Sequence, residues 1–241
     1  MANKIAILGD FNTAYTTHHA LNKTTQHVQS ALPEAVQFDW IGTDVFDPVQ
    51  AFEHEGYKGL WIAPGSPYRN DQNAIDVITY ARTNNIPTLG NCGGFQYMLI
   101  EFARNVCGIE HAGHEETDAD GKELVITKLS CSLVEKEEEL AITDTSSLLY
   151  SIIKKEKLSG RYYCSYGLNE AYHEILKDHG LSFTAFSPGN EVRAFELKTH
   201  PFFLGTLFQP ALTSTAGEPN PIIISFVQHS IKTVNTLNSS L

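Results

Sequence analysis

The sequence lacks the features that mark membrane, secreted and nucleic-acid-binding proteins. No apolar run approaches the roughly 20 residues that a membrane-spanning helix needs. The N-terminus has no basic segment followed by a long apolar one, so we expect no secretory signal. Lys and Arg number 17 against 28 Asp and Glu, and the net charge of −11 disfavours binding to nucleic-acid phosphates. We therefore expect a cytoplasmic protein that binds a small molecule or another protein.

Cysteine is also scarce, and its spacing argues against disulfides and structural metals. The four cysteines form no C-x-x-C pair, and they are Cys92, Cys107, Cys131 and Cys164. We expect them to be reduced thiols. The segment from His111 to Glu116 is rich in metal-binding residue types, but it lacks a second ligand pair and a helical i, i+4 histidine pair. No metal site and no cofactor are expected.

Strand and helix patterns alternate along the N-terminal part of the chain. Strands are predicted at 4–8, 36–41, 60–63 and 87–89, with helices at 16–32 and 71–84 between them and Asp71 as a helix cap. This alternation predicts an α/β fold with a mostly parallel central sheet flanked by helices. Ligands in such sheets bind beyond the carboxyl ends of the strands, where 64–67, Cys92 and the loop after Gly9 would lie.

The C-terminal part predicts an antiparallel extension of this sheet. Residues 181–187 and 191–197 flank Pro188-Gly189-Asn190, which indicates a hairpin. Residues 203–208 are predicted as the last core strand, and 221–237 as a helix whose inward positions are Ile223, Val227, Ile231 and Val234. Because no repeat or linker interrupts the chain, we expect one domain over residues 1–241.

The most informative stretch is Ile86-Pro-Thr-Leu-Gly-Asn-Cys-Gly-Gly-Phe-Gln96. An apolar run ends at Leu89, Cys92 follows, and after two glycines the apolar residues recur at helical spacing. A cysteine at such a strand-to-helix corner is held in a strained conformation at a helix N-terminus, where peptide dipoles favour a thiolate. The pattern predicts a nucleophile elbow with cysteine as its nucleophile. The alternative is a buried, inert cysteine in a glycine-rich loop.

Several stretches together resemble the class I glutamine amidotransferases, and among them the C-terminal glutaminase domain of CTP synthases. The similar stretches are Pro64-Gly65 and residues 74–82, 86–96, 100–106 and 200–210. The resemblance implies a flavodoxin-like core and a cysteine that attacks the amide carbon of glutamine. The synthase domain that precedes this module in the family is absent from the sequence, so we expect a free-standing module.

The resemblance also implies roles for individual residues. Cys92 matches the nucleophile, and the backbone at Gly65 and Gly93 matches the oxyanion-hole positions. Gln96 falls in the substrate pocket. Glu116 falls where the family recognises the substrate amino group, although it could equally be one more carboxylate on an acidic loop.

Three departures from the family pattern limit what the resemblance implies. The family has Phe-His-Pro-Glu where this chain has Phe208-Gln-Pro-Ala211, so Gln209 cannot take up a proton and Ala211 cannot orient a base. A family run of alternating Arg and His, which helps to hold the glutamine carboxylate, is here Arg161-Tyr162-Tyr163-Cys164-Ser165-Tyr166. Gly93 replaces a bulkier apolar residue, so we expect a roomier pocket beside Cys92. A base from elsewhere is open, and the candidates are His18, His19, His114 and His173.

Three hypotheses follow. The first is a degenerate amidotransferase-like domain that binds an amino-acid-like or amide ligand, or regulates a partner, without efficient hydrolysis. The second is a cysteine enzyme acting on another substrate, in a pocket rebuilt by Gly93, Tyr162, Tyr163 and Cys164. The third is an ammonia-donating glutaminase subunit for a separate CTP-synthase-like partner.

Overall fold

The structure is a computed structural model that describes residues 3–238, with side chains through residue 232. Its strands are β1 (Asn3–Leu8), β2 (Val36–Ile41), β3 (Tyr57–Ile62), β4 (Thr88–Asn91), β5 (Gly113–His114), β6 (Leu124–Lys128), β7 (Glu137–Ile142), β8 (Lys157–Arg161), β9 (Tyr166–Leu168), β10 (Leu181–Phe186), β11 (Val192–Leu197) and β12 (Phe203–Thr206). Its helices are α1 (Thr16–Ala31), α2 (Asp71–Thr83), α3 (Gly93–Asn105), α4 (Leu148–Ile153), α5 (His173–Asp178) and α6 (Pro221–Asn238), with short helical turns η1 (Gln50–His54), η2 (Glu170–Tyr172) and η3 (Pro210–Thr213).

One large mixed sheet carries the fold. It has nine strands in the order β2-β1-β3-β4-β12-β11-β10-β7-β8, and the first five run parallel to one another. The remaining pairs are antiparallel. The α/β fold with a parallel core and an antiparallel extension is therefore confirmed, but the extension is larger than the single predicted hairpin. A separate three-stranded sheet, β5-β6-β9, lies beside it.

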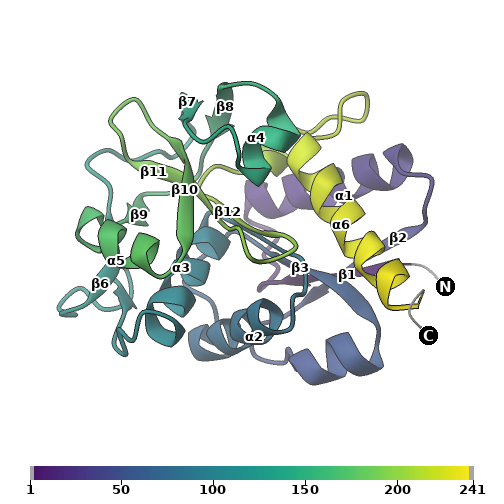
Figure 1. The fold of residues 1–241 in the computed structure, drawn as a ribbon, viewed down its shortest axis with the longest axis horizontal. Coiled ribbons are helices and arrows are strands. Elements are labelled where there is room, and N and C mark those ends of the chain that lie inside the picture. The colour runs from purple at the N-terminus through teal and green to yellow at the C-terminus, as the bar shows by residue number, and fades with distance from the viewer. Residues whose placement is uncertain (1–2, 239–241) are drawn as a thin grey trace.

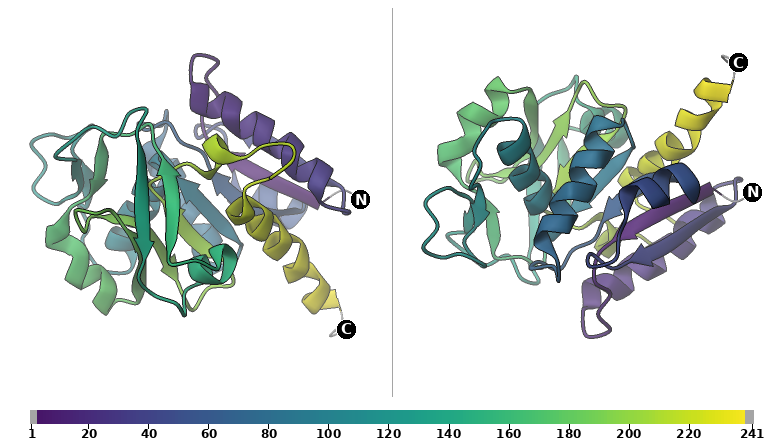
Figure 2. Two further views of the ribbon diagram at one scale, coloured as in Figure 1. Left: turned by 90° about the horizontal axis from the view of Figure 1, so that it is seen from above. Right: turned by 90° about the horizontal axis from the view of Figure 1, so that it is seen from below.

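Helices cover both faces of the parallel part of the sheet (Figures 1 and 2). In Figure 1, α1 and α6 lie above β1 and β3, whereas α2 and the blue turn η1 lie below them. The helix α3 packs beside α2, and its residues from Gly93 through Ala103 are all buried. In residues 3–238, no helix combines the length and the apolar character needed to cross a membrane.

Most predicted elements are confirmed, and the differences are local. The cap of α2 is Asn70, whose side chain accepts a hydrogen bond from the Asn73 amide, so the prediction of Asp71 as the cap is wrong. Asp71 is the first helical residue, and its carboxylate instead accepts bonds from the Tyr68 amide and the Tyr97 hydroxyl. In α6, Ile223 and Val227 are buried as predicted. Val234 lies outside the residues whose side chains are described.

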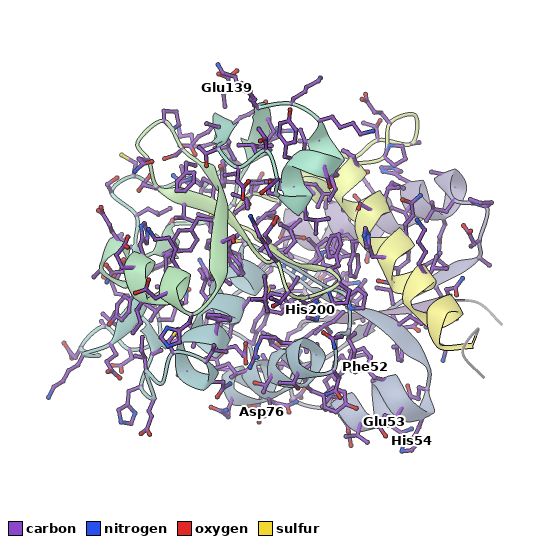
Figure 3. The ribbon with its side chains drawn as sticks, viewed as in Figure 1. Phe52, Glu53, His54, Asp76, Glu139 and His200 are labelled. Carbon is purple, nitrogen blue, oxygen red and sulfur yellow. The ribbon has the colours of Figure 1, made fainter. Side chains whose placement is uncertain are left out.

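Figure 3 shows labelled side chains on opposite sides of the molecule. Phe52, Glu53 and His54 lie on η1 at one side of the view, and Glu139 on β7 lies at the opposite side. Between them, the buried core runs continuously from β1 to the antiparallel strands. The fold therefore places the carboxyl ends of β3, β4 and β12 side by side near the middle of the sheet.

Candidate functional site

Cys92 occupies the predicted corner between β4 and α3. Its φ of 53° and ψ of −106° place a non-glycine residue in a sparsely populated backbone region. The corner is fixed because the Cys92 amide donates to the Thr206 carbonyl at 3.0 Å and the Cys92 carbonyl accepts from the Gln96 amide at 3.1 Å. The strand–corner–helix geometry predicted for a nucleophile elbow is present.

The backbone packs so closely around this corner that two positions admit only glycine. A Cβ on Gly94 would lie 2.5 Å from the Ile62 carbonyl oxygen, and a Cβ on Gly90 would meet the Met98 sulfur and the Gly94 backbone. These contacts hold α3 against the ends of β3 and β4. They leave the Cys92 side chain, which is 6% exposed, at the floor of a cavity.

That cavity has a volume of about 380 Å³ and collects most of the predicted site residues. Its walls include Gly65, Cys92, Gln96, Glu116, Tyr163 and Gln209. The first turn of α1 and the segment from Tyr163 to Tyr166 close its sides. Residues from the N-terminal, central and C-terminal parts of the chain thus meet around one cysteine.

Three predicted site residues lie away from the cavity. The Arg161 guanidinium faces Glu137, with 3.8 Å between Nε and Oε2, and another of its nitrogens donates to the Leu212 carbonyl. Tyr162 is fully buried, and the Arg193 guanidinium lies 5.8 Å from its ring centre. Ala211 contributes its carbonyl to a hydrogen bond from Thr24. Of the aromatic residues that replace the family's Arg and His run, the cavity therefore takes Tyr163 and Tyr166 but not Tyr162.

The prediction that Gly93 makes the pocket roomier is wrong. Gly93 does not line the cavity, because the loop that carries Gly65 and Ser66 fills the space beside it. A Cβ at position 93 would lie 3.0 Å from the Ser66 nitrogen and 3.3 Å from the Gly65 nitrogen. The two backbone N–H groups predicted for the oxyanion hole, at Gly65 and Gly93, are therefore close neighbours in the fold.

A hydrogen-bonded group of side chains forms the wall behind Glu116. His114 donates from Nε2 to Gln96 Oε1 at 3.1 Å and accepts the Glu116 amide at Nδ1. Gln96 in turn donates to the Tyr166 carbonyl at 2.9 Å, and Ser66 lies between Gln96 Oε1 and the Glu116 carboxylate. Burial lowers the pKa of His114 to about 4, so this ring is neutral and both of its nitrogens are occupied. The spacing of these residues along the sequence does not indicate that their side chains meet.

The other candidate bases are also engaged elsewhere. His18 donates from Nε2 to the Pro64 carbonyl at 2.8 Å and accepts the Asn12 amide at Nδ1. His19 contacts the Thr13 carbonyl, and His173 packs against Phe183. Among residues 3–238, no histidine lines the cavity, and no group of three or more His, Cys, Asp or Glu is placed to hold a metal ion.

Gln209 lines the cavity and has an unpaired side-chain amide nitrogen. The residue is 2% exposed and lines the cavity, and its Nε2 has no hydrogen-bond partner among the described residues. Glu116 stands at the rim, where partial burial raises the pKa of its carboxyl group against the opposing effect of the Ser66 hydroxyl. The cavity wall thus combines a carboxyl group, a glutamine whose buried amide nitrogen is unpaired, and a cysteine at a helix N-terminus.

Known proteins match this chain over nearly its whole length. The CTP synthase of Nautilia profundicola is 30% identical over an alignment that covers 95% of this chain and 46% of that protein. The CTP synthase of Christiangramia forsetii is 33% identical, with 96% and 45% covered. The chain therefore spans less than half the length of these curated relatives.

A solved structure and a family model agree with these matches. The glutaminase domain of Trypanosoma brucei CTPS, solved with bound acivicin, superposes with a TM-score of 0.86 at 26% identity and covers 96% of this chain and 94% of that chain. The model of the class I glutamine amidotransferase family matches residues 18–229. The chain belongs to the class I glutamine amidotransferases and is related to the glutaminase domain of CTP synthase.

Proposed function

We propose that this chain binds a small amino-acid-like or amide ligand in the Cys92 cavity and that conventional glutamine hydrolysis is impaired or lost. Gln209 carries the proposal, because it stands where the family resemblance expects the histidine base and its side chain does not titrate near neutral pH. Its unpaired amide nitrogen favours contact with a ligand oxygen over proton transfer. Ala211 has no side-chain group with which to orient a base.

The position of Glu116 supports an amino group in the ligand. An ammonium group at the cavity rim would pair with the Glu116 carboxylate and lower the pKa that partial burial raises. Arg161 points to Glu137 and Leu212 instead of into the cavity, so a ligand carboxylate would rely on the Gln209 amide and on backbone N–H groups. This arrangement suits a glutamine-like molecule held differently from the way the family resemblance implies.

Calorimetric titration with glutamine and with acivicin, which the Trypanosoma brucei domain binds, tests the proposal. Glu116→Gln should weaken binding by about tenfold or more, because an ammonium group would lose its charged partner. Gln209→Leu should weaken it as well, since the ligand oxygen would lose a donor. Asp120→Asn, a change of an exposed carboxylate in the same loop, should leave binding unaltered. No saturable binding of either compound by the folded protein contradicts the proposal.

The printed names of the relatives suggest the partner. More than half of each matched CTP synthase lies outside the alignment, so the protein that this module would regulate or supply is one that resembles the remaining part of CTP synthase. A role in pyrimidine nucleotide synthesis would follow from such a pairing. Co-purification with a synthase-like partner, followed by an assay of ammonia delivery to it, separates supply from regulation: regulation predicts stable association without delivery.

A further inference from the structure

Two of the four cysteines meet in the cavity. Cys92 comes from the elbow, and Cys164 comes from the irregular segment between β8 and β9. Both line the cavity, and each is only 6% exposed. The glutamine-like ligand proposed above makes no use of Cys164.

Backbone contacts hold the two cysteines together independently of any ligand. The Cys92 thiol lies 3.9 Å from the Tyr163 carbonyl oxygen, which belongs to the peptide bond that joins Tyr163 to Cys164. The Cys92 amide and the Cys164 thiol contact successive carbonyls at the end of β12, those of Thr206 and Leu207. The two residues therefore meet at one short stretch of backbone in the wall of the cavity.

The surroundings of the two thiols suit them to different roles in a reaction. Hydrogen bonding to Cys92 and burial raise the pKa of Cys164 well above its ordinary value, so Cys164 keeps its proton. Cys92 sits at the N-terminus of the 13-residue helix α3, where backbone N–H groups stabilise negative charge. Cys164 is therefore the protonated thiol of the pair, and Cys92, at the helix N-terminus, is the residue whose position suits a nucleophile.

We propose that Cys92 and Cys164 form a redox-active pair that reduces a small hydroperoxide and closes to a disulfide. The Cys92 thiolate attacks the terminal oxygen of the hydroperoxide, the O–O bond breaks, and the leaving oxygen takes a proton and departs as an alcohol, or as water from hydrogen peroxide. Cys92 is then a sulfenic acid. The Cys164 sulfur attacks the Cys92 sulfur, the S–O bond breaks, and the hydroxide leaves as water with the Cys164 proton. Two thiols and one hydroperoxide give one disulfide, one alcohol and one water.

The remaining cysteines are not placed for this chemistry. Cys107 contacts the Ile175 carbonyl beside α5, and burial raises its pKa to about 11. Cys131 is exposed and does not line the cavity. A disulfide between Cys92 and Cys164 would tie the elbow to the segment before β9 and remove the Cys92 sulfur from the cavity. Oxidation would thereby block whatever ligand reacts at Cys92.

The test treats the reduced 241-residue chain with one equivalent of hydrogen peroxide. Thiol titration should fall from four groups to two. Peptide mapping without reductant should find Cys92 linked to Cys164, and dithiothreitol should restore all the thiols. Cys92 should react about tenfold faster than the exposed Cys131. None of these measurements needs a variant to fold.

Two variants sharpen the result. In Cys164→Ser, the sulfenic acid on Cys92 should persist and be trapped by dimedone, since no thiol is present to condense with it. Cys131→Ser should form the Cys92–Cys164 link as the unmodified chain does. The proposal is overturned if Cys92 of the unmodified chain accumulates as sulfenic or sulfinic acid while Cys164 stays a free thiol, or if Cys92 reacts no faster than Cys131.

Discussion

The two sides of the Cys92 cavity are built in different ways. The elbow side consists of backbone in close contact, with Gly94 against Ile62 and the Gly65–Ser66 loop against Gly93. The opposite side consists of side chains, from Tyr163 to Tyr166 and Gln209, carried on backbone that bonds to other strands. The geometry of the elbow therefore depends on backbone contacts and not on the side chains across the cavity.

The largest effect is expected from a substitution that disrupts the close backbone packing on the elbow side of the cavity. Gly94→Ala places a Cβ 2.5 Å from the Ile62 carbonyl oxygen and 2.9 Å from the Ile62 Cβ, so strand or helix must shift. We expect a loss of about 3 kcal/mol in the free energy of unfolding, despite the better helix propensity of alanine. Chemical denaturation measures it. Gly217→Ala, with no atom within 4 Å of the new Cβ, is the control, and equal stabilities would contradict the close-packed elbow.

The next largest effect is expected from restoring, on the opposite side of the cavity, the side chains that the family pattern implies. Gln209→His combined with Ala211→Glu supplies a base and its orienter at the positions that the family pattern implies. Glutamine hydrolysis should rise by about 10²-fold, the usual contribution of a positioned general base. Gln209→His alone should gain less. Adding Cys92→Ala should abolish the gain, and an unchanged rate in the folded double variant would show that the side chains are not what limits the reaction.

Acid should weaken the wall that contains His114. The folded protein holds the pKa of His114 at about 4, while in the unfolded chain it returns to the ordinary 6.5. As pH falls below 6.5, the unfolded state binds the proton first, so stability present above 6.5 is lost progressively down to 4. By about pH 5 the loss amounts to about 2 kcal/mol. His114→Gln should remove this dependence in unfolding curves, and an equal loss in both proteins would refute it.

The smallest expected effect comes from replacing the residues that cap two helices, one beside each half of the sheet. Asn70 caps α2 beside the parallel strands, and Ser147 caps α4 beside the antiparallel strands. Replacing either with alanine should cost about 1 kcal/mol. If the chain is one cooperative domain, both variants shift a single unfolding midpoint. Two separable transitions, each sensitive to one variant, would argue for two domains.

Patterns confined to one stretch of chain were enough to predict much of the fold. The strand at Val36–Ile41, the hairpin of β10 and β11, and the corner at Cys92 follow from apolar periodicity and turn residues that lie within a few positions of one another. The cap at Asn70 was missed because Asp71 is an equally good capping residue type by composition. Its carboxylate is instead drawn to Tyr68 and Tyr97, a tertiary contact.

Contacts between distant residues account for what sequence reasoning missed at the site. The meeting of His114 with Gln96, and of Cys92 with Cys164, depends on how β6 and β9 pack beside α3. Tyr162 and Tyr163 were both expected in the pocket, and only Tyr163 lines it, because the Tyr162 ring is buried beside the Arg193 guanidinium. The space beside Gly93 is filled by the Gly65–Ser66 loop. Because this loop lies far earlier in the chain, no pattern near Gly93 could reveal the contact.

Ammonia release from glutamine by the purified, reduced chain tests the central claim most directly. The account predicts saturable binding with turnover slower than about 10⁻³ s⁻¹, against about 10 s⁻¹ for a typical enzyme, because no base stands at Gln209. Turnover near the ordinary rate, abolished by Cys92→Ala, would contradict the account and identify the chain as a working glutaminase.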